Sequence, residues 1–134
     1  MLISTKGRYA LRVLTDMAEH GGSEYIKLKD IAERQEISEK YLESIVKQLV
    51  KNKIVSGLRG KGGGYKLSKA PDEINAGEIL RIMEGGLAPV ACLENGDGDC
   101  VRSCECKTLP IWQNLDKIIN DYLESVKLSD LINR

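Results

Sequence analysis

The sequence predicts a mainly α-helical fold with one small β-hairpin. Apolar residues recur at helical spacing in several stretches, two short strand-like stretches flank a glycine-rich loop, and a C-terminal stretch repeats apolar residues in steps of three and four. The chain has 134 residues, 42% of them hydrophobic, and no phenylalanine. It can therefore form one small core of Leu, Ile, Val and Tyr, with an appended element.

Two helices are expected at the start of the chain. The first runs from about Ser4 to Glu19 and ends at Gly21-Gly22, and the second covers about Leu28 to Gln35. The apolar residues that define them are Tyr9, Ala10, Val13, Leu14 and Met17 in the first helix, and Leu28, Ile31 and Ala32 in the second.

A tight turn then leads into a third helix, from about Glu39 to Asn52. Ile37 can pack in the turn, and Ser38 can cap the helix through its hydroxyl. The expected buried face comprises Leu42, Ile45, Val46, Leu49 and Val50. The face left for solvent or a partner comprises Lys40, Tyr41, Glu43, Ser44, Lys47, Gln48 and Lys51. Two short helices joined in this way are typical of a helix-turn-helix, although a plain helical hairpin shares the periodicity.

The following segment favours the helix-turn-helix. Two strands, Ile54 to Leu58 and Tyr65 to Leu67, are expected around the loop Arg59 to Gly64, whose glycines permit positive φ and a close approach of backbone N–H groups to a ligand. A hairpin in this place is a wing. The loop lacks the G-x-x-x-x-G-K-[ST] pattern and the strand-to-helix context of an NTPase, so we exclude nucleotide hydrolysis. A purely structural hairpin remains the alternative.

Charge is distributed unevenly along a chain whose formal net charge is zero. Residues 1–70 hold 14 Lys/Arg and 8 Asp/Glu, whereas residues 71–134 hold 6 and 12. From Lys40 to Lys69 there are eight basic residues and a single acid, Glu43. Such asymmetry points to contact with nucleic acid, and a solvated basic face is the alternative.

Two further helices are expected in the second half. One begins after Asn75, which can cap it with Glu78 in a capping box, and ends at Gly85-Gly86. The last begins near Pro110 after a Thr108 cap. Its apolar positions are Trp112, Leu115, Ile119, Tyr122 and Val126, widened by Ile111 and Ile118. This spacing suits packing within the subunit or against a second copy, and the DNA hypothesis favours the second copy because a dimer reaches two half-sites about 34 Å apart.

These elements predict three regions. Residues 1–70 form a winged helix-turn-helix DNA-binding domain, residues 71–108 a connecting helix and a Cys-rich loop, and residues 109–134 a long dimerisation helix with a C-terminal tail. The longest charge-free stretch near the cysteines is too short to span a membrane, and the sequence predicts a cytoplasmic protein. With one histidine, no nucleophile motif and no paired carboxylates, it is not expected to be an enzyme.

Four cysteines lie within fifteen positions, spaced C-x7-C-x3-C-x-C. In a cytoplasmic protein such a group suits metal, cluster or redox chemistry better than a disulfide scaffold. The spacing does not supply the two C-x2-4-C pairs that structural zinc sites favour. Thiolates suit an iron-sulfur cluster because soft sulfur donors hold iron.

Several motifs resemble one known family along essentially the whole chain: the Rrf-type winged-helix transcriptional regulators, the group of IscR, NsrR and CymR. The motifs that carry the resemblance are the stretches Ser4 to Arg12, Ile31 to Gln35, Ile37 to Glu43, Arg59 to Tyr65 and Lys127 to Leu131. The resemblance implies a homodimeric bacterial regulator that binds a double-stranded DNA operator. One position departs from the pattern, since Glu36 stands where many members have glycine.

The resemblance also implies the residues of each site. The third helix would enter the major groove and the wing would contact the adjacent backbone or minor groove. The expected DNA-binding residues are Ser38, Lys40, Tyr41, Glu43 and Ser44 with Arg59, Lys61, Gly62 and Gly63 of the wing. The expected ligands of an iron-sulfur cluster (2Fe-2S or 4Fe-4S) are Cys92, Cys100 and Cys106.

The fourth cluster ligand and the signal stay open. Leu109 replaces the histidine of IscR-like sequences, and Arg8 occupies the place of an acidic residue in some NsrR-like proteins. The other candidates are Cys104, Asp97, Asp99, Glu105 or a small exogenous molecule. The cluster would sense iron-sulfur status, redox state or nitric oxide. The alternatives are a thiol switch, for instance between Cys104 and Cys106, and a cysteine-metabolism repressor controlled by a protein partner such as cysteine synthase.

Overall fold

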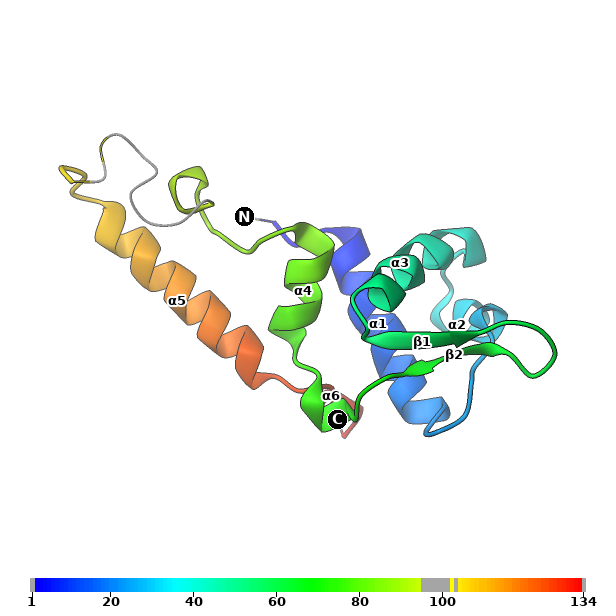
Figure 1. Cartoon of the computed structure of the whole chain (residues 1–134). Helices are drawn as coiled ribbons and strands as arrows, with labels where there is room; N and C mark the ends of the chain where they lie inside the picture. Colours follow the sequence, from blue (N-terminus) through cyan, green and yellow to red (C-terminus); the bar gives the residue numbers. More distant parts are fainter. Residues whose placement is uncertain (1, 95–101, 103, 134) are drawn as a thin grey trace.

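The computed structural model describes residues 2–94, 102 and 104–133, and confirms the mainly helical fold with one hairpin (Figure 1). Its elements are α1 (Thr5–His20), α2 (Leu28–Gln35), α3 (Glu39–Lys51), β1 (Val55–Leu58), β2 (Gly64–Leu67), the short 3-10 helix η1 (Pro71–Glu73), α4 (Ala76–Glu84), the 3-10 helix η2 (Ala91–Leu93), α5 (Leu109–Ser125) and α6 (Leu128–Ile132). Most boundaries lie within one or two residues of those that the sequence predicts.

Helix α1 is the centre of the fold. The Ser4 hydroxyl caps it by accepting a hydrogen bond of 3.1 Å from the Gly7 N–H. Its buried face contacts α2, α3, α4, α6 and β2. Leu14, Ile31 and Ile45, from the first three helices, are fully buried in the shared core. Burying these aliphatic side chains supplies most of the driving force for folding.

The helix-turn-helix forms as expected. Helix α2 ends at Glu36, which has left-handed backbone angles (φ 56°, ψ 46°), and the buried Ile37 donates its N–H to the Ala32 carbonyl at 3.1 Å. A left-handed residue after a helix is normally glycine, so Glu36 adopts the same conformation at an energetic cost. Ser38 caps α3, because its hydroxyl accepts a hydrogen bond of 3.1 Å from the Tyr41 N–H.

The wing is a two-stranded antiparallel hairpin in which Val55 pairs with Leu67 and Leu58 with Gly64. Ile26, in the segment before α2, adds a bridge to Tyr65 through two hydrogen bonds of 2.8 Å. This bridge attaches the hairpin to the helices. In the loop, Gly62 has φ 79°, and a Cβ on Gly63 would meet the Leu58 carbonyl oxygen at 2.2 Å. These two positions therefore require glycine for the turn itself.

Helix α5 leads away from the winged domain, with α4 between them (Figure 1). The Asn75 side chain caps α4 by accepting a hydrogen bond of 2.8 Å from the Glu78 N–H. Gly85 follows the last residue of the helix and has left-handed backbone angles (φ 80°). Arg81 of α4 donates to Asn120 of α5 at 2.7 Å, which holds the two helices together. After α5 the chain returns to the core, where Leu128 is fully buried and donates its N–H to the Ile74 carbonyl.

One expectation for α5 is wrong. Thr108 occupies the N-cap position, but its hydroxyl makes no capping hydrogen bond and lies 3.4 Å from the Cys106 sulfur instead. The predicted apolar stripe is covered only in part within the subunit. Trp112 and Ile119 are half-buried, whereas Ile111, Leu115, Ile118 and Tyr122 are exposed. The reason is that α4 covers one side of α5 only.

Candidate nucleic-acid interface

The exposed face of α3 carries the polar residues that the sequence assigns to DNA. Lys40, Tyr41, Glu43 and Ser44 are exposed, as is the capping residue Ser38. The Ser44 hydroxyl donates to the Tyr41 carbonyl at 2.7 Å. These side chains come from the first turns of a helix that begins at an open end of the domain, and this arrangement matches a helix presented to a major groove.

Tyr41 is held by α1. Its ring meets the Tyr9 ring edge-on, with centroids 5.8 Å apart, and the Arg12 guanidinium lies 5.2 Å from the Tyr9 centroid. Such aromatic and cation–π contacts are each worth about 1 kcal/mol. Sequence reasoning did not give Tyr9 and Arg12 this role. The signal available was their place in the Ser4 to Arg12 motif.

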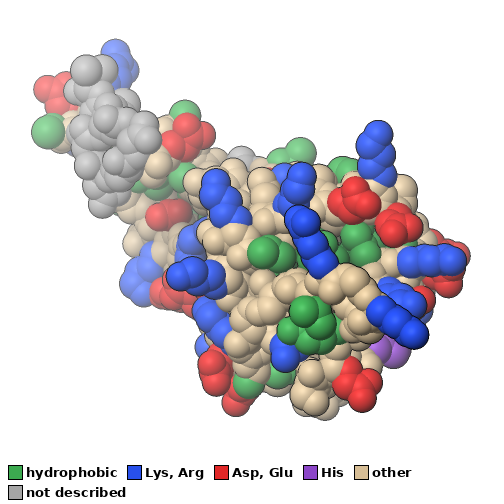
Figure 2. Space-filling model, turned by 45° about the vertical axis from the view of Figure 1, so that its right-hand side comes forward, with side chains coloured by type: hydrophobic (Ala, Val, Ile, Leu, Met, Phe, Trp, Pro, Cys, Tyr) green, Lys and Arg blue, Asp and Glu red, His purple; other side chains and the backbone are tan. Residues whose placement is uncertain are grey.

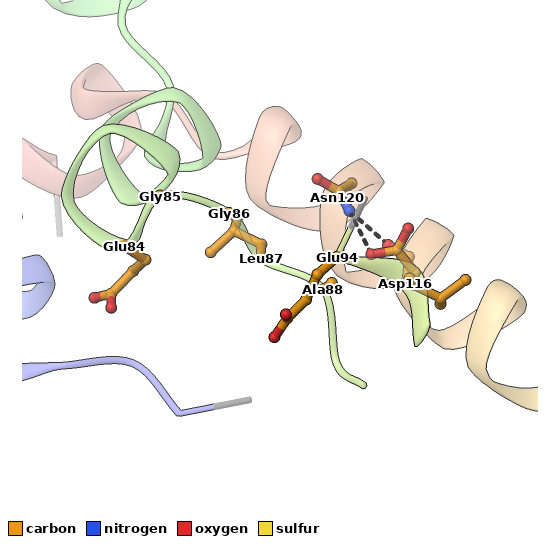
Figure 3. Close-up of a pocket in the computed structure, with 9 residues that line it drawn as sticks. Glu84, Gly85, Gly86, Leu87, Ala88, Glu94, Asp116 and Asn120 are labelled. Atoms are coloured by element: carbon orange, nitrogen blue, oxygen red, sulfur yellow. Dashed lines mark hydrogen bonds between the residues drawn. The ribbon is translucent and has the colours of Figure 1, made fainter. Parts of the chain in front are cut away.

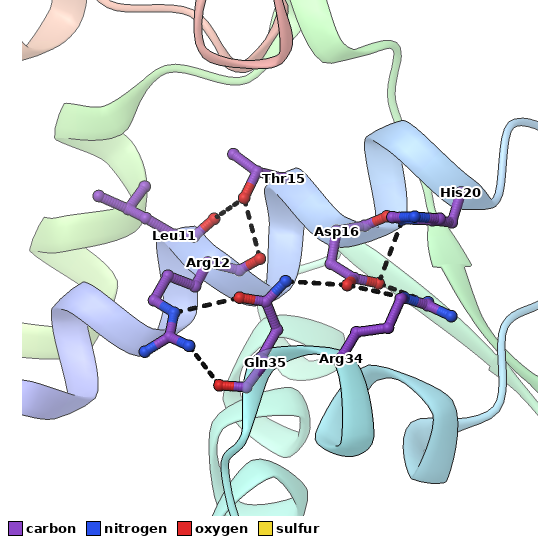
Figure 4. A network of polar contacts seen from close by, with 7 residues as sticks. All are labelled: Leu11, Arg12, Thr15, Asp16, His20, Arg34 and Gln35. Carbon is purple, nitrogen blue, oxygen red and sulfur yellow. Dashed lines mark hydrogen bonds and ion pairs between the residues drawn. The ribbon is translucent and has the colours of Figure 1, made fainter. Parts of the chain in front are cut away.

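A polar network fixes the turn between α2 and α3 (Figure 4). Arg12 donates to the side-chain oxygen of Gln35 at 3.1 Å and also to its backbone carbonyl. Gln35 donates in turn to Asp16 at 2.9 Å, and Arg34 makes two hydrogen bonds to the same carboxylate, at 2.6 and 3.0 Å. Helix α1 therefore sets the position of the turn, and through it the start of α3.

Asp16 is the one buried charged residue in the described part of the chain. Burial raises the pKa of its carboxyl, but the hydrogen bonds from Arg34 and Gln35 and the positive charge of Arg34 together outweigh burial, so the pKa lies below its ordinary value of 3.8. The hydrogen bond to Asp16 likewise raises the pKa of Arg34. Asp16 is therefore ionised at neutral pH and holds Arg34 by charge.

The wing carries three basic residues, of which Arg59 lines a groove together with Lys47 and Val50 of α3. Arg59 and Lys61 are exposed in the loop, and Lys66 of β2 lies over the Tyr25 ring, 4.7 Å from its centroid. Figure 2 shows Lys and Arg side chains spread over the face of the winged domain that this view presents, with hydrophobic side chains between them and Asp and Glu side chains mostly toward its edges. This surface has the charge that a phosphate backbone requires.

One residue of the α3 face lies where the sequence did not predict it. Val50 was expected to be buried, but 39% of its surface is exposed. It lies seven residues after Glu43 and three after Lys47, so it belongs to the same strip of the helix as they do. The strip therefore ends in an apolar residue next to the wing.

The described cysteines lie away from the wing. Cys92 is half-buried in η2, Cys104 is exposed and Cys106 is half-buried before α5. Hydrogen bonds from Thr108 lower the pKa of the Cys106 thiol below 9.0. Cys100, Asp97 and Asp99 lie outside the described residues. The donor set is chemically suited to iron, although no group of three or more metal-ligating side chains is gathered within the part of the chain described.

The same end of the molecule carries an acidic pocket of about 550 Å³ between the end of α4, η2 and α5 (Figure 3). Glu84, Glu94 and Asp116 line it. Asn120 donates to the Asp116 carboxylate at 3.2 Å, and Glu84 accepts hydrogen bonds from the Ser4 N–H and hydroxyl. Carboxylates at this surface disfavour phosphate, which is consistent with the predicted nucleic-acid interface at the wing end of the molecule.

The comparison with known families identifies the chain. Residues 3–134 match the family model Rrf2, described as an iron-dependent transcriptional regulator. The chain belongs to the Rrf2 family of transcriptional regulators. The family resemblance expected from the sequence is thus confirmed, and a match over nearly the whole chain covers both the winged domain and α5.

Relatives of this Rrf2-family chain include regulators of two kinds. It is 37% identical over 133 residues to the HTH-type transcriptional regulator IscR of Erwinia tasmaniensis, covering 99% of this chain and 79% of that protein. Among solved structures, CymR, the global cysteine regulator of B. subtilis, has a TM-score of 0.82 at 35% identity, covering 99% of this chain and 97% of that one. The structure of T. potens IscR has a TM-score of 0.79 at 34% identity, and the match covers 99% of this chain and 87% of that one.

The sequence predicts neither an enzyme nor a membrane-spanning helix. The relatives are named as transcriptional regulators, which confirms that the chain is not an enzyme. Among the described residues of this Rrf2-family chain, we find no helix with the length and apolarity that a bilayer crossing needs. The DNA-binding residues, the cluster ligands and the three region boundaries stay predictions.

Proposed function

We propose that this Rrf2-family regulator binds double-stranded operator DNA as a homodimer in the cytoplasm. The observation that carries the proposal is the exposed polar face of α3 beside a basic wing, at the end of the molecule opposite the acidic pocket. The proposed contacts are Ser38, Lys40, Tyr41, Glu43 and Ser44 from α3 and its cap, with Arg59, Lys61, Gly62 and Gly63 from the wing. Gly62 would act through its backbone N–H group, whereas the Gly63 N–H donates to the Gly60 carbonyl at 3.0 Å, so Gly63 would contribute by shaping the turn.

The exposed apolar face of α5 supports a homodimer. Ile118 and Tyr122 are 64% and 65% exposed, and Ile111 and Leu115 extend the same face by about one turn each. A row of large, exposed apolar side chains along one helix suits packing against its own copy. A dimer would then present two winged domains to two half-sites.

We further propose that Cys92, Cys100 and Cys106 hold an iron-sulfur cluster. The support is the thiolate donor set, the lowered pKa of Cys106, and relatives named IscR. When bound, the cluster supplies a redox-sensitive link between thiolates. Cys92 and Cys106 stand at the two ends of the segment that joins η2 to α5, so tying them together fixes how α5 leaves the winged domain. The spacing of the two DNA-reading units would respond to loss of that link.

A second candidate has its own support. The structural likeness to CymR, at a TM-score of 0.82, favours a cysteine-metabolism repressor that works without a cluster. Control would come from a protein partner such as cysteine synthase, or from oxidation of thiols such as Cys104 and Cys106.

Anaerobic purification followed by visible absorption spectroscopy separates the two candidates. Charge-transfer bands are expected in the wild type, and they should disappear in Cys92→Ala, Cys100→Ala and Cys106→Ala. Cys104→Ala is the matched control and should keep the bands. Operator binding by the wild type should change when the cluster is lost, whereas the three variants should bind as the cluster-free protein does. A protein that stays colourless after reconstitution, or that reads DNA identically with and without the three thiols, refutes cluster sensing.

A further inference from the structure

A groove of about 370 Å³ separates α3 from the wing. Lys47 and Val50 of α3 form one wall. The hairpin forms the other through Gly57, Leu58, Arg59, Gly64 and Tyr65. Because two of these residues are glycines, no side chain from them fills the space.

Apolar and cationic side chains line the groove together. Val50 and Leu58 are 39% and 49% exposed, one on each wall. Lys47 and Arg59 are exposed at the same groove and make none of the ion pairs formed within the described chain. The groove thus offers apolar contact and two positive charges together.

The form of the DNA duplex decides what enters such a groove. A major groove and the minor groove beside it are separated by one sugar–phosphate strand. If α3 occupies the first and the wing reaches the second, that strand has to pass between α3 and the wing. Its phosphates are anionic, and the carbon edges of its deoxyriboses are apolar. Both properties match this groove.

We propose that the groove seats one backbone strand of the operator, with Val50 and Leu58 packed against deoxyribose and Lys47 and Arg59 paired with the flanking phosphates. The inference rests on the proposed DNA-binding function and adds a contact made by apolar side chains that read no base. Affinity therefore depends on two terms, an ionic one that salt weakens and an apolar one that salt leaves unchanged.

The two terms are separated by titrating salt. The wild-type protein first selects a duplex from a random library. The affinity for that duplex is then measured at a series of KCl concentrations for the wild type, Val50→Ser, Leu58→Ser and Lys47→Gln. The two serine variants should bind about fivefold more weakly each, with an unchanged slope of log affinity against log salt. Lys47→Gln should lower the slope by about 0.9 for each phosphate contact removed. Leu131→Ser is the matched control: Leu131 is 38% exposed on α6, and its variant should bind as the wild type does.

The outcomes can be told apart. Circular dichroism and thermal melting first establish that every variant is folded, which is expected because the substituted side chains are partly exposed. Serine variants that bind like the wild type, or that lower the slope as Lys47→Gln does, overturn the proposal. The proposal is also overturned if the serine variants lose the dimer in sedimentation while their DNA binding is unchanged, because the groove is then covered by the second copy and not by DNA. If the wild type selects no duplex, the proposed function itself fails.

Discussion

At the residue scale, Glu36 shows how the fold imposes a conformation on a residue that does not favour it. The turn of the helix-turn-helix needs a left-handed residue, and Glu36 adopts φ 56° while its N–H bonds to the Ala32 carbonyl. Glu36 stands where many members of the family have glycine, and this difference therefore leaves the turn intact. Its effect is energetic, because an L-residue in this region carries a steric penalty.

Glu36→Gly is expected to stabilise the protein by about 0.5 to 1 kcal/mol. Relief of the left-handed strain exceeds the extra backbone entropy that glycine loses on folding. The free energy of unfolding from urea titration measures the change. Glu33→Gly, at an exposed helical position of α2, is the control and should destabilise by about 1 kcal/mol. If both variants changed the free energy of unfolding in the same direction, the strain argument would be contradicted.

Asp16→Asn is expected to destabilise the protein by about 2 kcal/mol at neutral pH, since it removes the charge that holds the partly exposed Arg34. The lowered pKa of Asp16 gives this loss a pH dependence. The stabilisation is complete above the ordinary pKa of 3.8 and is lost as the pH falls below that value through the folded-state pKa. The difference in unfolding free energy between wild type and variant should therefore shrink below pH about 4.

Urea titrations at a series of pH values measure that difference. Asp121→Asn, which removes an exposed carboxylate paired with Lys117, is the control and should change stability little at any pH. A constant difference between wild type and Asp16→Asn down to strong acid would show that the Arg34 contact does not depend on ionised Asp16.

At the element scale, the ends of helices were the most predictable features, because they depend on neighbouring residues. Ser38, Asn75 and Gly85 lie at helix ends in the structure as the sequence predicts. Thr108 does not cap α5, because its backbone is helical (φ −94°, ψ −12°) and not extended as at the capping residues Ser38 and Asn75. Val50 was placed in the core by periodicity, yet it faces the wing, whose position no local pattern encodes.

Ser38 allows the stability of α3 to be separated from its binding. Ser38→Ala should destabilise by about 1 kcal/mol through loss of the cap. Ser38→Asp keeps a capping oxygen, so stability is retained, but its negative charge should weaken binding to DNA about fivefold or more at moderate salt. Urea titration and a mobility-shift assay give the two quantities. Ser4→Ala removes the cap of α1 and should cost stability while leaving a direct DNA contact untouched. Unchanged DNA affinity in Ser38→Asp would remove Ser38 from the interface.

At the scale of the whole molecule, the proposed dimer makes α5 the link between assembly and DNA binding. Ile118→Glu places a charge in the middle of the exposed apolar face and should raise the dimer dissociation constant at least about a hundredfold. Operator affinity should fall with it, because one winged domain reaches a single half-site. Analytical ultracentrifugation measures the first effect and a mobility-shift assay the second. Lys117→Gln, on the adjacent polar side, should remain dimeric. An intact dimer in Ile118→Glu would assign the interface to another surface.

The sequence by itself determined which segments are helices, where the wing turns, that the chain is a winged helix-turn-helix protein of this family, and which half is basic, because these depend on local spacing and composition. Only the tertiary structure decided which apolar residues stay uncovered. Ile118 and Val50 are exposed, whereas Trp112 and Ile119 are half-buried, since burial depends on which elements pack together across long separations in sequence. The support that α1 gives to α3 through Tyr9, and the groove between α3 and the wing, arise for the same reason.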